Sequence, residues 1–216
     1  MRTILMLTGY AQVGKDTFAK RLVEAHGFAR VSFADPMREA LYKLNPSINV
    51  AEVYETDAPK DCAKFLMARG SPIAIPLRII IDHFGWDRAK VLFPEIRQLL
   101  QRFGTEVGRE MFGDNFWVDQ AIKKIDQSPS YRIVITDARF DNEVERIRQL
   151  YQWSAHHYLV KVIRPGFIPV NAHKSDAGLS EFLIDFDIVN DSSIDELNSK
   201  VDRVIEAIGL TKREAA

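Results

Sequence analysis

One segment near the start of the chain constrains its fold most, a glycine-lysine loop with the sequence Gly9-Tyr10-Ala11-Gln12-Val13-Gly14-Lys15-Asp16-Thr17. The apolar run 3–8 precedes the loop and predicts a buried strand. Apolar residues then recur at helical spacing from Phe18 to Val23, and Gly27 is typical of a helix end. Strand, loop and helix together place backbone N–H groups, a positive helix end and a lysine around a phosphate chain. We therefore expect a nucleotide site here, built from Gln12, Val13, Gly14, Lys15, Asp16 and Thr17.

The loop departs from the common pattern at Asp16, where a serine or threonine usually follows the lysine. A carboxylate is a hard oxygen ligand and could hold Mg²⁺ directly or through water. The alternative is an acid that only favours the positive N-terminus of a helix. We favour the metal role, because a carboxylate beside a polyphosphate is repelled unless a cation lies between them.

Composition limits the classes of protein that the chain can belong to. Its 216 residues are 46% hydrophobic and carry a net charge of −1, which suits a single domain with a substantial core. No long basic run is present, which argues against a nucleic-acid partner. A single cysteine, Cys62, excludes an internal disulfide framework and suits the cytoplasm. We expect neither a signal peptide nor a membrane span.

Strands and helices are expected to alternate along most of the chain. Further strands are predicted at 28–33, 131–136, 158–163 and 186–189, with a C-terminal helix over 197–208. This alternation predicts an α/β fold, a parallel sheet flanked by helices with its ligands at the carboxyl ends of the strands. The stretch of about 50–127 does not follow this alternation. Prolines divide it into short pieces, and its pattern predicts mostly helix. We interpret it as an insertion, within a single domain of 1–216, that carries the second substrate.

The predicted insertion contains a set of residues suited to ligand binding. Arg97, Gln101 and Thr105 recur every four residues and would share one helix face. Gly104 would let the backbone approach a ligand closely, and Trp117 could stack on a nucleobase. The alternatives are a solvated charge for Arg97, a helix end for Gly104 and a core position for Trp117.

A further motif, with Asp137, Arg139 and Glu143, follows the predicted strand 131–136. An aspartate at a strand's carboxyl end can orient a sugar hydroxyl or a metal-bound water. An arginine two residues later can neutralise the charge that spreads over a transferred phosphoryl group. The alternative is an aspartate N-cap with an Arg–Glu pair on the next helix.

Taken together, these segments resemble the deoxynucleoside monophosphate kinase family of bacteriophages. The resemblance is carried by GYAQVGKDT, SFADPMREAL, RQLLQRFGTEVGRE with FWVD, VITDARFDNEVE, and more weakly by HKSDAGL and IVNDSSIDEL. It implies a P-loop, nucleoside-monophosphate-kinase-like three-layer fold, with a five-stranded parallel sheet, a helical substrate-binding insertion and a lid. It also implies transfer of a phosphoryl group from ATP, with Mg²⁺, to a deoxynucleoside 5′-monophosphate, which supplies precursors for DNA synthesis.

The resemblance also implies roles for single residues. Lys15, Asp16, Asp137 and Arg139 would be catalytic, with Asp16 at the metal, and Arg164 would reach ATP from a lid. The deoxynucleotide would be bound by Ser32, Arg38, Arg97, Gln101, Gly104, Thr105, Trp117, Asp137 and Glu143. Asn190 to Ser193 would lie where related folds receive adenine. Gln98 stands where a basic residue is usual, and Asp176 replaces a more common glutamate, so neither Asp176 nor His173 is given a role.

The resemblance suggests a homodimer in the cytoplasm, which is the host's if the protein is of phage origin. Two other functions remain open from the sequence. One is another small-molecule P-loop kinase, such as dephospho-coenzyme A kinase, which would not be expected to have the Arg97-to-Trp117 set. The other is a nucleotide-hydrolysing switch or DNA-packaging module, which needs a water-positioning group and a partner surface.

Overall fold

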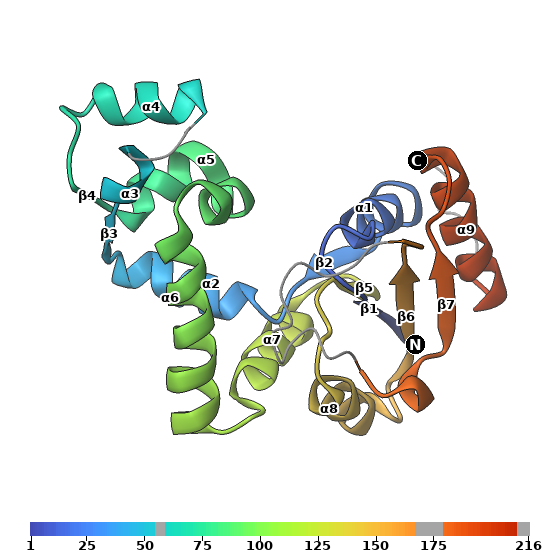
Figure 1. Ribbon diagram of the computed structural model, residues 1–216. Helices are drawn as coiled ribbons and strands as arrows, with labels where there is room; N and C mark the ends of the chain where they lie inside the picture. The colour runs from blue at the N-terminus through green and yellow to red at the C-terminus, as the bar shows by residue number, and fades with distance from the viewer. Residues whose placement is uncertain (55–58, 167–178, 211–216) are drawn as a thin grey trace. The chain divides into compact units, whose positions relative to one another are not determined.

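A computed structural model describes residues 1–54, 59–166 and 179–210 (Figure 1). The chain forms two compact units. The first consists of Met1–Asp35 with Asn115–Ala216, and the second of Pro36–Asp114. The second unit thus begins and ends earlier than the expected insertion over 50–127.

The first unit is built on a parallel sheet with the strand order β2-β5-β1-β6-β7 (Figure 1). The strands are β1 (Arg2–Thr8), β2 (Ala29–Val31), β5 (Arg132–Ile135), β6 (Ala155–Ile163) and β7 (Phe186–Val189). The predicted five-stranded parallel sheet is therefore confirmed. The strand that leads into the glycine-lysine loop, β1, lies at its centre.

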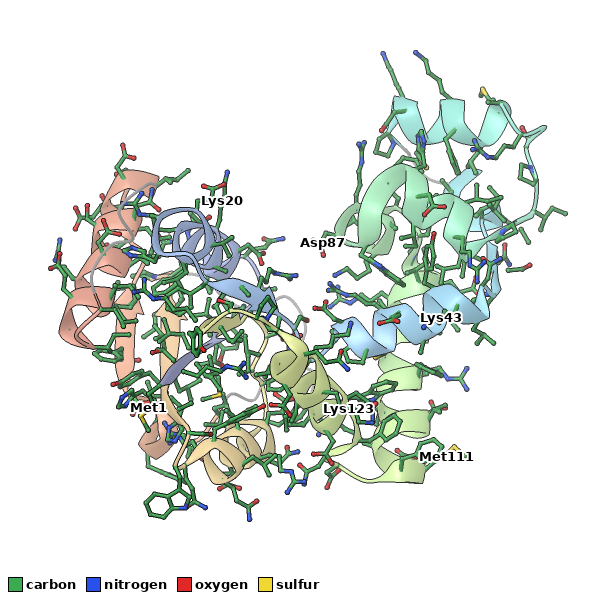
Figure 2. The ribbon with its side chains drawn as sticks, turned by 180° about the vertical axis from the view of Figure 1, so that it is seen from behind. Met1, Lys20, Lys43, Asp87, Met111 and Lys123 are labelled. Atoms are coloured by element: carbon green, nitrogen blue, oxygen red, sulfur yellow. The ribbon has the colours of Figure 1, made fainter. Side chains whose placement is uncertain are left out.

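Helices cover both faces of this sheet, which gives three layers (Figure 1). They are α1 (Lys15–His26), α7 (Phe116–Gln127), α8 (Asp141–Tyr151) and α9 (Ile194–Ala207), with a short 3-10 turn, η3, at Glu181–Leu183. Alternation along β1 supplies both cores, because successive side chains of a strand point to opposite faces. Ile4 and Met6 pack with α7 and α8, while Leu5 and Leu7 pack with α1 and α9. Side chains fill the space between the sheet and its helices (Figure 2).

Helix α7 explains why the first unit resumes at Asn115. Its apolar face buries Val118, Ala121 and Ile125 in the same core as β1 and β5. That burial ties 116–127 to the sheet, although the proline-rich sequence before it suggests one continuous insertion.

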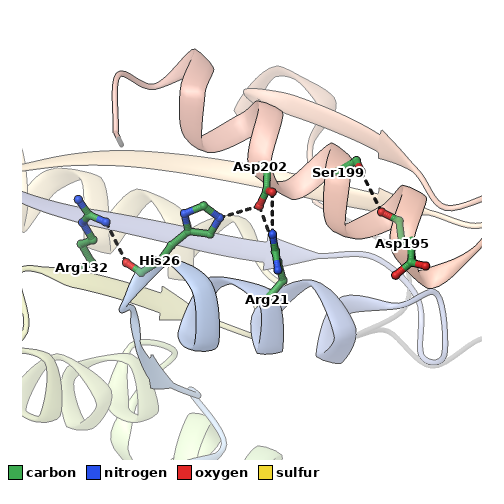
Figure 3. Close-up of polar contacts among 6 residues, drawn as sticks. All are labelled: Arg21, His26, Arg132, Asp195, Ser199 and Asp202. Carbon is green, nitrogen blue, oxygen red and sulfur yellow. Dashed lines mark hydrogen bonds and ion pairs between the residues drawn. The ribbon is translucent and has the colours of Figure 1, made fainter. Parts of the chain in front are cut away.

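Polar contacts hold α9 against α1, the helix that follows the glycine-lysine loop (Figure 3). Arg21 donates to both carboxylate oxygens of Asp202, at 3.0 and 2.7 Å. The Nε2 atom of His26, a buried side chain, lies 2.8 Å from the same carboxylate. Gly27 ends α1 in the left-handed conformation, as its sequence position predicts.

The second unit has its own apolar core. Its elements are α2 (Asp35–Leu44, whose first residue belongs to the first unit), β3 (Ser47–Asn49), α3 (Ala51–Tyr54), α4 (Lys60–Met67), β4 (Ala74–Pro76), α5 (Leu77–Leu92), α6 (Pro94–Arg102) and η1 (Phe103–Glu110). The predicted helical character holds, and Pro94 opens α6 as expected. The antiparallel pair β3–β4 was not predicted, because runs of three residues carry too little alternation to be recognised.

Two irregularities interrupt the helices of the second unit. Gly85 breaks α5 with a non-helical conformation, at φ 69° and ψ 165°. The segment η1 is a π-helix that continues from α6. Across the described ranges, no helix has the length and apolar character needed to cross a membrane.

Candidate active site

The candidate site gathers at one edge of the sheet of the first unit. The glycine-lysine loop follows β1, the segment 32–34 follows β2, and Asp137 follows β5. Arg164 and Asn190 follow β6 and β7. Because all five strands are parallel, these segments leave the sheet at its carboxyl edge, where such folds bind ligands.

The backbone of the glycine-lysine loop requires both of its glycines. Gly9 and Gly14 have φ values of 125° and 107°, which side-chain-bearing residues rarely adopt. A Cβ atom on Gly9 would lie 2.3 Å from the carbonyl oxygen of Val162, so β6 also excludes a side chain there. The loop is therefore pressed closely against the sheet.

Lys15 begins α1 and lies over the loop. Its Nζ atom donates to the carbonyl oxygens of Gly9 and Tyr10, each at 2.6 Å. Asp16 and Thr17 follow in the first turn, where the N–H groups at the start of a helix favour anions. The Asp16 side chain is exposed. These positions match a loop that surrounds a phosphate chain.

Two predicted residues, Ser32 and Asp137, come together in the structure. The hydroxyl of Ser32, a buried side chain, donates to Oδ2 of Asp137 at 2.6 Å. The N–H groups of Phe33 and Ala34 donate to the same carboxylate, at 2.8 and 3.1 Å. Asp137 is not the N-cap of α8, which is Phe140. Its carboxylate instead fixes the segment between β2 and α2.

Glu143 and Arg139 are also neighbours, and Glu143 contacts the backbone of Arg139. Oε2 of Glu143 accepts from the N–H groups of Arg139 and Phe140, at 2.7 and 3.2 Å. Glu143 is buried, whereas the side chain of Arg139 is exposed. Glu143 therefore holds the turn that presents Arg139 at the carboxyl edge.

Asn190 makes a contact that the sequence did not predict. Its Nδ2 atom donates to the carbonyl oxygen of Val13 at 2.8 Å, inside the glycine-lysine loop. Its backbone N–H donates to the carbonyl oxygen of Ile163 at 2.6 Å. The next residue, Asp191, bonds to Lys200, which lowers the pKa of the Asp191 carboxyl group. The sequence signal that could have indicated this contact is a polar residue directly after the last strand.

The second unit holds most of the predicted acceptor-binding residues. Arg97 and Gln101 are exposed on α6 and share a face, as expected. Thr105 belongs to the π-helix η1, whose wider turns do not follow the four-residue rule. Gly104 packs closely in this unit, because a Cβ atom there would lie 2.9 Å from Sδ of Met37.

An ion pair between α6 and η1 does not include the predicted residues Arg97, Gln101 and Thr105. Arg102 pairs with Glu106, at 3.0 Å from Nε to Oε1, and this contact lowers the pKa of the exposed Glu106 carboxyl group. Within the described residues of its own unit, Arg97 forms no ion pair.

The remaining predicted residues belong to different units. Trp117 lies on α7 in the first unit, is 8% exposed, and packs edge-on against Phe116 with ring centroids 4.8 Å apart. Arg38 lies on α2 in the second unit, and Arg164 is exposed after β6. His173 and Asp176 lie outside the described residues.

A parallel sheet in the order β2-β5-β1-β6-β7, with a glycine-lysine loop after its central strand, defines a phosphate-loop nucleotide-binding protein of the α/β class. The family model of deoxynucleotide monophosphate kinase matches residues 90–201, just over half of the chain. The chain belongs to this family.

Individual relatives agree with the family match. A protein of Acanthamoeba polyphaga mimivirus, provisionally named deoxynucleotide monophosphate kinase, is 27% identical over 92% of this chain and 93% of its own length. The deoxynucleoside-5′-monophosphate kinase of Escherichia phage T5 is 34% identical over 46% of this chain and 40% of its own. The deoxynucleotide monophosphate kinase of Escherichia phage RB69 is 33% identical over 51% and 44%. The chain thus matches less than half the length of each of these two phage enzymes.

Proposed function

We propose that this protein transfers the γ-phosphoryl group of ATP to the 5′-phosphate of a deoxynucleoside monophosphate, and so supplies diphosphates for DNA synthesis. The proposal is carried by the family match together with the glycine-lysine loop at the carboxyl end of β1. The two supports are independent, because the matched residues 90–201 do not include the loop.

ATP is bound by the phosphate loop. The backbone N–H groups of Gln12 to Thr17 and the start of α1 surround its phosphates, and Lys15 reaches the outer ones. The contacts of Lys15 to the carbonyl oxygens of Gly9 and Tyr10 support this role, since they keep its ammonium group beside the loop. Arg164 approaches the phosphates as part of a lid.

Asp16 fits a Mg²⁺ ion. Within the described residues, no group of three or more histidine, cysteine or acidic side chains could hold a metal ion by itself. Mg²⁺ commonly takes one or two carboxylates and completes its shell with substrate phosphates and water, so a single exposed carboxylate is sufficient. Bound there, the ion would neutralise charge on the phosphates of ATP.

The acceptor is bound by residues of the predicted set. Arg97 holds the 5′-phosphate, because it is exposed and makes no ion pair with the described residues of its own unit. Gln101 and Thr105 supply hydrogen bonds to the nucleoside. The π-helix η1 supports this assignment, because such segments are frequent at functional sites. Trp117 is 8% exposed and packs against Phe116, which favours the core position over base stacking for this residue.

Transfer is direct and in line. An oxygen of the acceptor phosphate attacks the γ-phosphorus, the bond to the β–γ bridging oxygen breaks, and ADP leaves. The acceptor is largely a dianion near neutral pH, so no strong general base is required. Lys15 and Arg139 neutralise the charge of the moving group, and closure of the site excludes water that would waste ATP.

A substrate panel tests the proposal. The protein is incubated with ATP and Mg²⁺ and, in separate reactions, with each deoxynucleoside monophosphate, each ribonucleoside monophosphate, dephospho-coenzyme A, or no acceptor. We expect at least one deoxynucleoside monophosphate to be converted to its diphosphate with an equal yield of ADP. Conversion of dephospho-coenzyme A alone would contradict the proposal. ADP formation at one rate with and without acceptors would also contradict it.

A further inference from the structure

We infer that Asn190 is a positioning residue for ATP, which acts through the Val13–Gly14 peptide of the phosphate loop. The inference rests on the proposed function in taking ATP as the ligand of this loop. It concerns a residue in the connection between β7 and α9, far from the loop in sequence.

The contact is a side-chain amide held against a loop carbonyl. Nδ2 of Asn190 donates to the oxygen of Val13 at 2.8 Å, a good hydrogen-bond length. The Val13 side chain is 1% exposed, so the loop is anchored from two sides at this residue. One side is the apolar core of the sheet, and the other is Asn190.

Because of the geometry of the peptide bond, this contact orients the N–H group of Gly14. A trans peptide is planar, and its C=O and N–H groups point in opposite directions. The structure contains no cis peptide bond among its described residues. When Asn190 holds the Val13 oxygen on the side of β7, the Gly14 N–H must point to the other side. Phosphate loops bind anions with such oriented N–H groups.

Gly14 shows how closely Asn190 fits against the loop. A Cβ atom on Gly14 would lie 2.5 Å from Nδ2 of Asn190. Gly14 is therefore required both by its φ of 107° and by the neighbouring amide. Its own carbonyl accepts the N–H of Phe18 at 2.9 Å, which starts α1. The same short backbone segment thus links Asn190 to the helix that carries Lys15.

Asn190 is itself held in place. Its N–H donates to the Ile163 oxygen of β6 at 2.6 Å. Nζ of Lys200 donates to the Val189 oxygen at 2.7 Å and to the Asp191 carboxylate at 2.9 Å. A rigid support of this kind orients the residue that it contacts without the cost of ordering it on binding.

The test compares Asn190→Ala and Asn190→Leu with Arg21→Ala. Both Asn190 variants remove the donor, and leucine keeps a similar size without adding charge. Arg21→Ala breaks the contact of α1 with Asp202 on α9, away from the loop, and serves as a control for lost stability. Three quantities are measured for each variant: the Kd of ATP with Mg²⁺ by calorimetry, the KM of the best deoxynucleotide from the panel, and the Tm.

We expect both Asn190 variants to raise the Kd of ATP by about tenfold, the effect of losing one hydrogen bond of ordinary strength. Their KM for the deoxynucleotide should stay within about twofold of the wild-type value, and Arg21→Ala should lower the Tm without changing the Kd of ATP. An unchanged Kd in both Asn190 variants would overturn the inference. Equal weakening of ATP and of the deoxynucleotide would also overturn it, as would failure of both variants to fold. Either result would show that Asn190 only stabilises the fold. ATP binding needs no acceptor, so a wild-type protein that binds ATP but phosphorylates no deoxynucleotide would refute only the proposed function.

Discussion

The hydroxyl group of Ser32 and the carboxylate of Asp137 are joined by a hydrogen bond of 2.6 Å, which links the ends of β2 and β5. The same carboxylate accepts the N–H groups of Phe33 and Ala34. The chain leaves the first unit at Asp35, directly after this anchored segment. Asp137 therefore anchors the last residues of the first unit before the chain enters the second.

Asp137→Asn should lower the free energy of unfolding by about 1–3 kcal/mol, because one oxygen becomes an NH₂ group and faces donors that need an acceptor. Ser32→Ala removes one donor to the carboxylate and a second acceptor of the Ala34 N–H, but keeps both backbone bonds to Asp137, so its loss should be smaller, about 1 kcal/mol. Urea unfolding of the two variants and the wild type measures the difference. A stability of Asp137→Asn equal to that of the wild type would show that the carboxylate does not anchor this segment.

Glu143→Gln separates an anchoring role from contact with the substrate. An amide oxygen can still accept from Arg139 and Phe140, so we expect this variant to keep most of its kcat/KM. Glu143→Ala leaves both N–H groups without that acceptor and should lower kcat/KM at least about tenfold by loosening the turn that carries Arg139. If Gln reduces deoxynucleotide binding as strongly as Ala while stability is kept, the negative charge itself contacts the substrate.

Asp16→Asn should raise the Mg²⁺ concentration needed for half-maximal activity and lower kcat, because a neutral amide is a poorer ligand for a hard cation. Asparagine and aspartate serve comparably at helix starts, so the fold should tolerate the change. Activity is titrated with Mg²⁺ at a fixed ATP concentration. Superimposable titration curves for variant and wild type would assign Asp16 to the start of α1 alone.

Arg97→Ala should weaken every accepted deoxynucleoside monophosphate by a similar factor, about 10- to 100-fold, because it removes a charge-assisted contact to their common phosphate. ATP binding should stay within about twofold. Arg102→Ala is a matched control, since it removes the same charge from the same helix and, among the described residues, breaks the exposed pair with Glu106. Equal effects of the two changes on deoxynucleotide KM would mean that charge in general, and not Arg97, attracts the acceptor.

Strong local patterns made the sheet predictable. Buried β1 and the glycine-lysine loop both appear in a few consecutive residues, and the helices α1 and α9 have clear apolar spacing. The end of α1 at Gly27 and the start of α6 at Pro94 follow from the conformations that these two residue types favour.

Features that depend on contacts between distant residues were not predictable. The extent of the second unit depends on where α7 buries its apolar face. Pro36 and Gly113 lie at its two ends, but prolines and glycines also occur inside the unit, so these residues do not mark its limits by themselves. The π-helix η1 changes helical spacing without a break in the sequence pattern. The contact of Asn190 with Val13 joins residues at opposite ends of the chain, so neither segment reveals it alone.

The fate of the γ-phosphate of ATP tests the central claim most directly. ATP labelled at its γ-phosphate is incubated with Mg²⁺ and one accepted deoxynucleoside monophosphate, with the wild type and with Lys15→Ala. Lys15 donates to two loop carbonyls at the exposed or partly buried start of α1, so its loss should leave the fold intact. The account predicts that the label appears as the β-phosphate of the deoxynucleoside diphosphate with the wild type. The variant should lose several kcal/mol of transition-state stabilisation and fall at least about 1,000-fold in rate. Release of the label as free phosphate, or equal transfer by both proteins, would contradict the account.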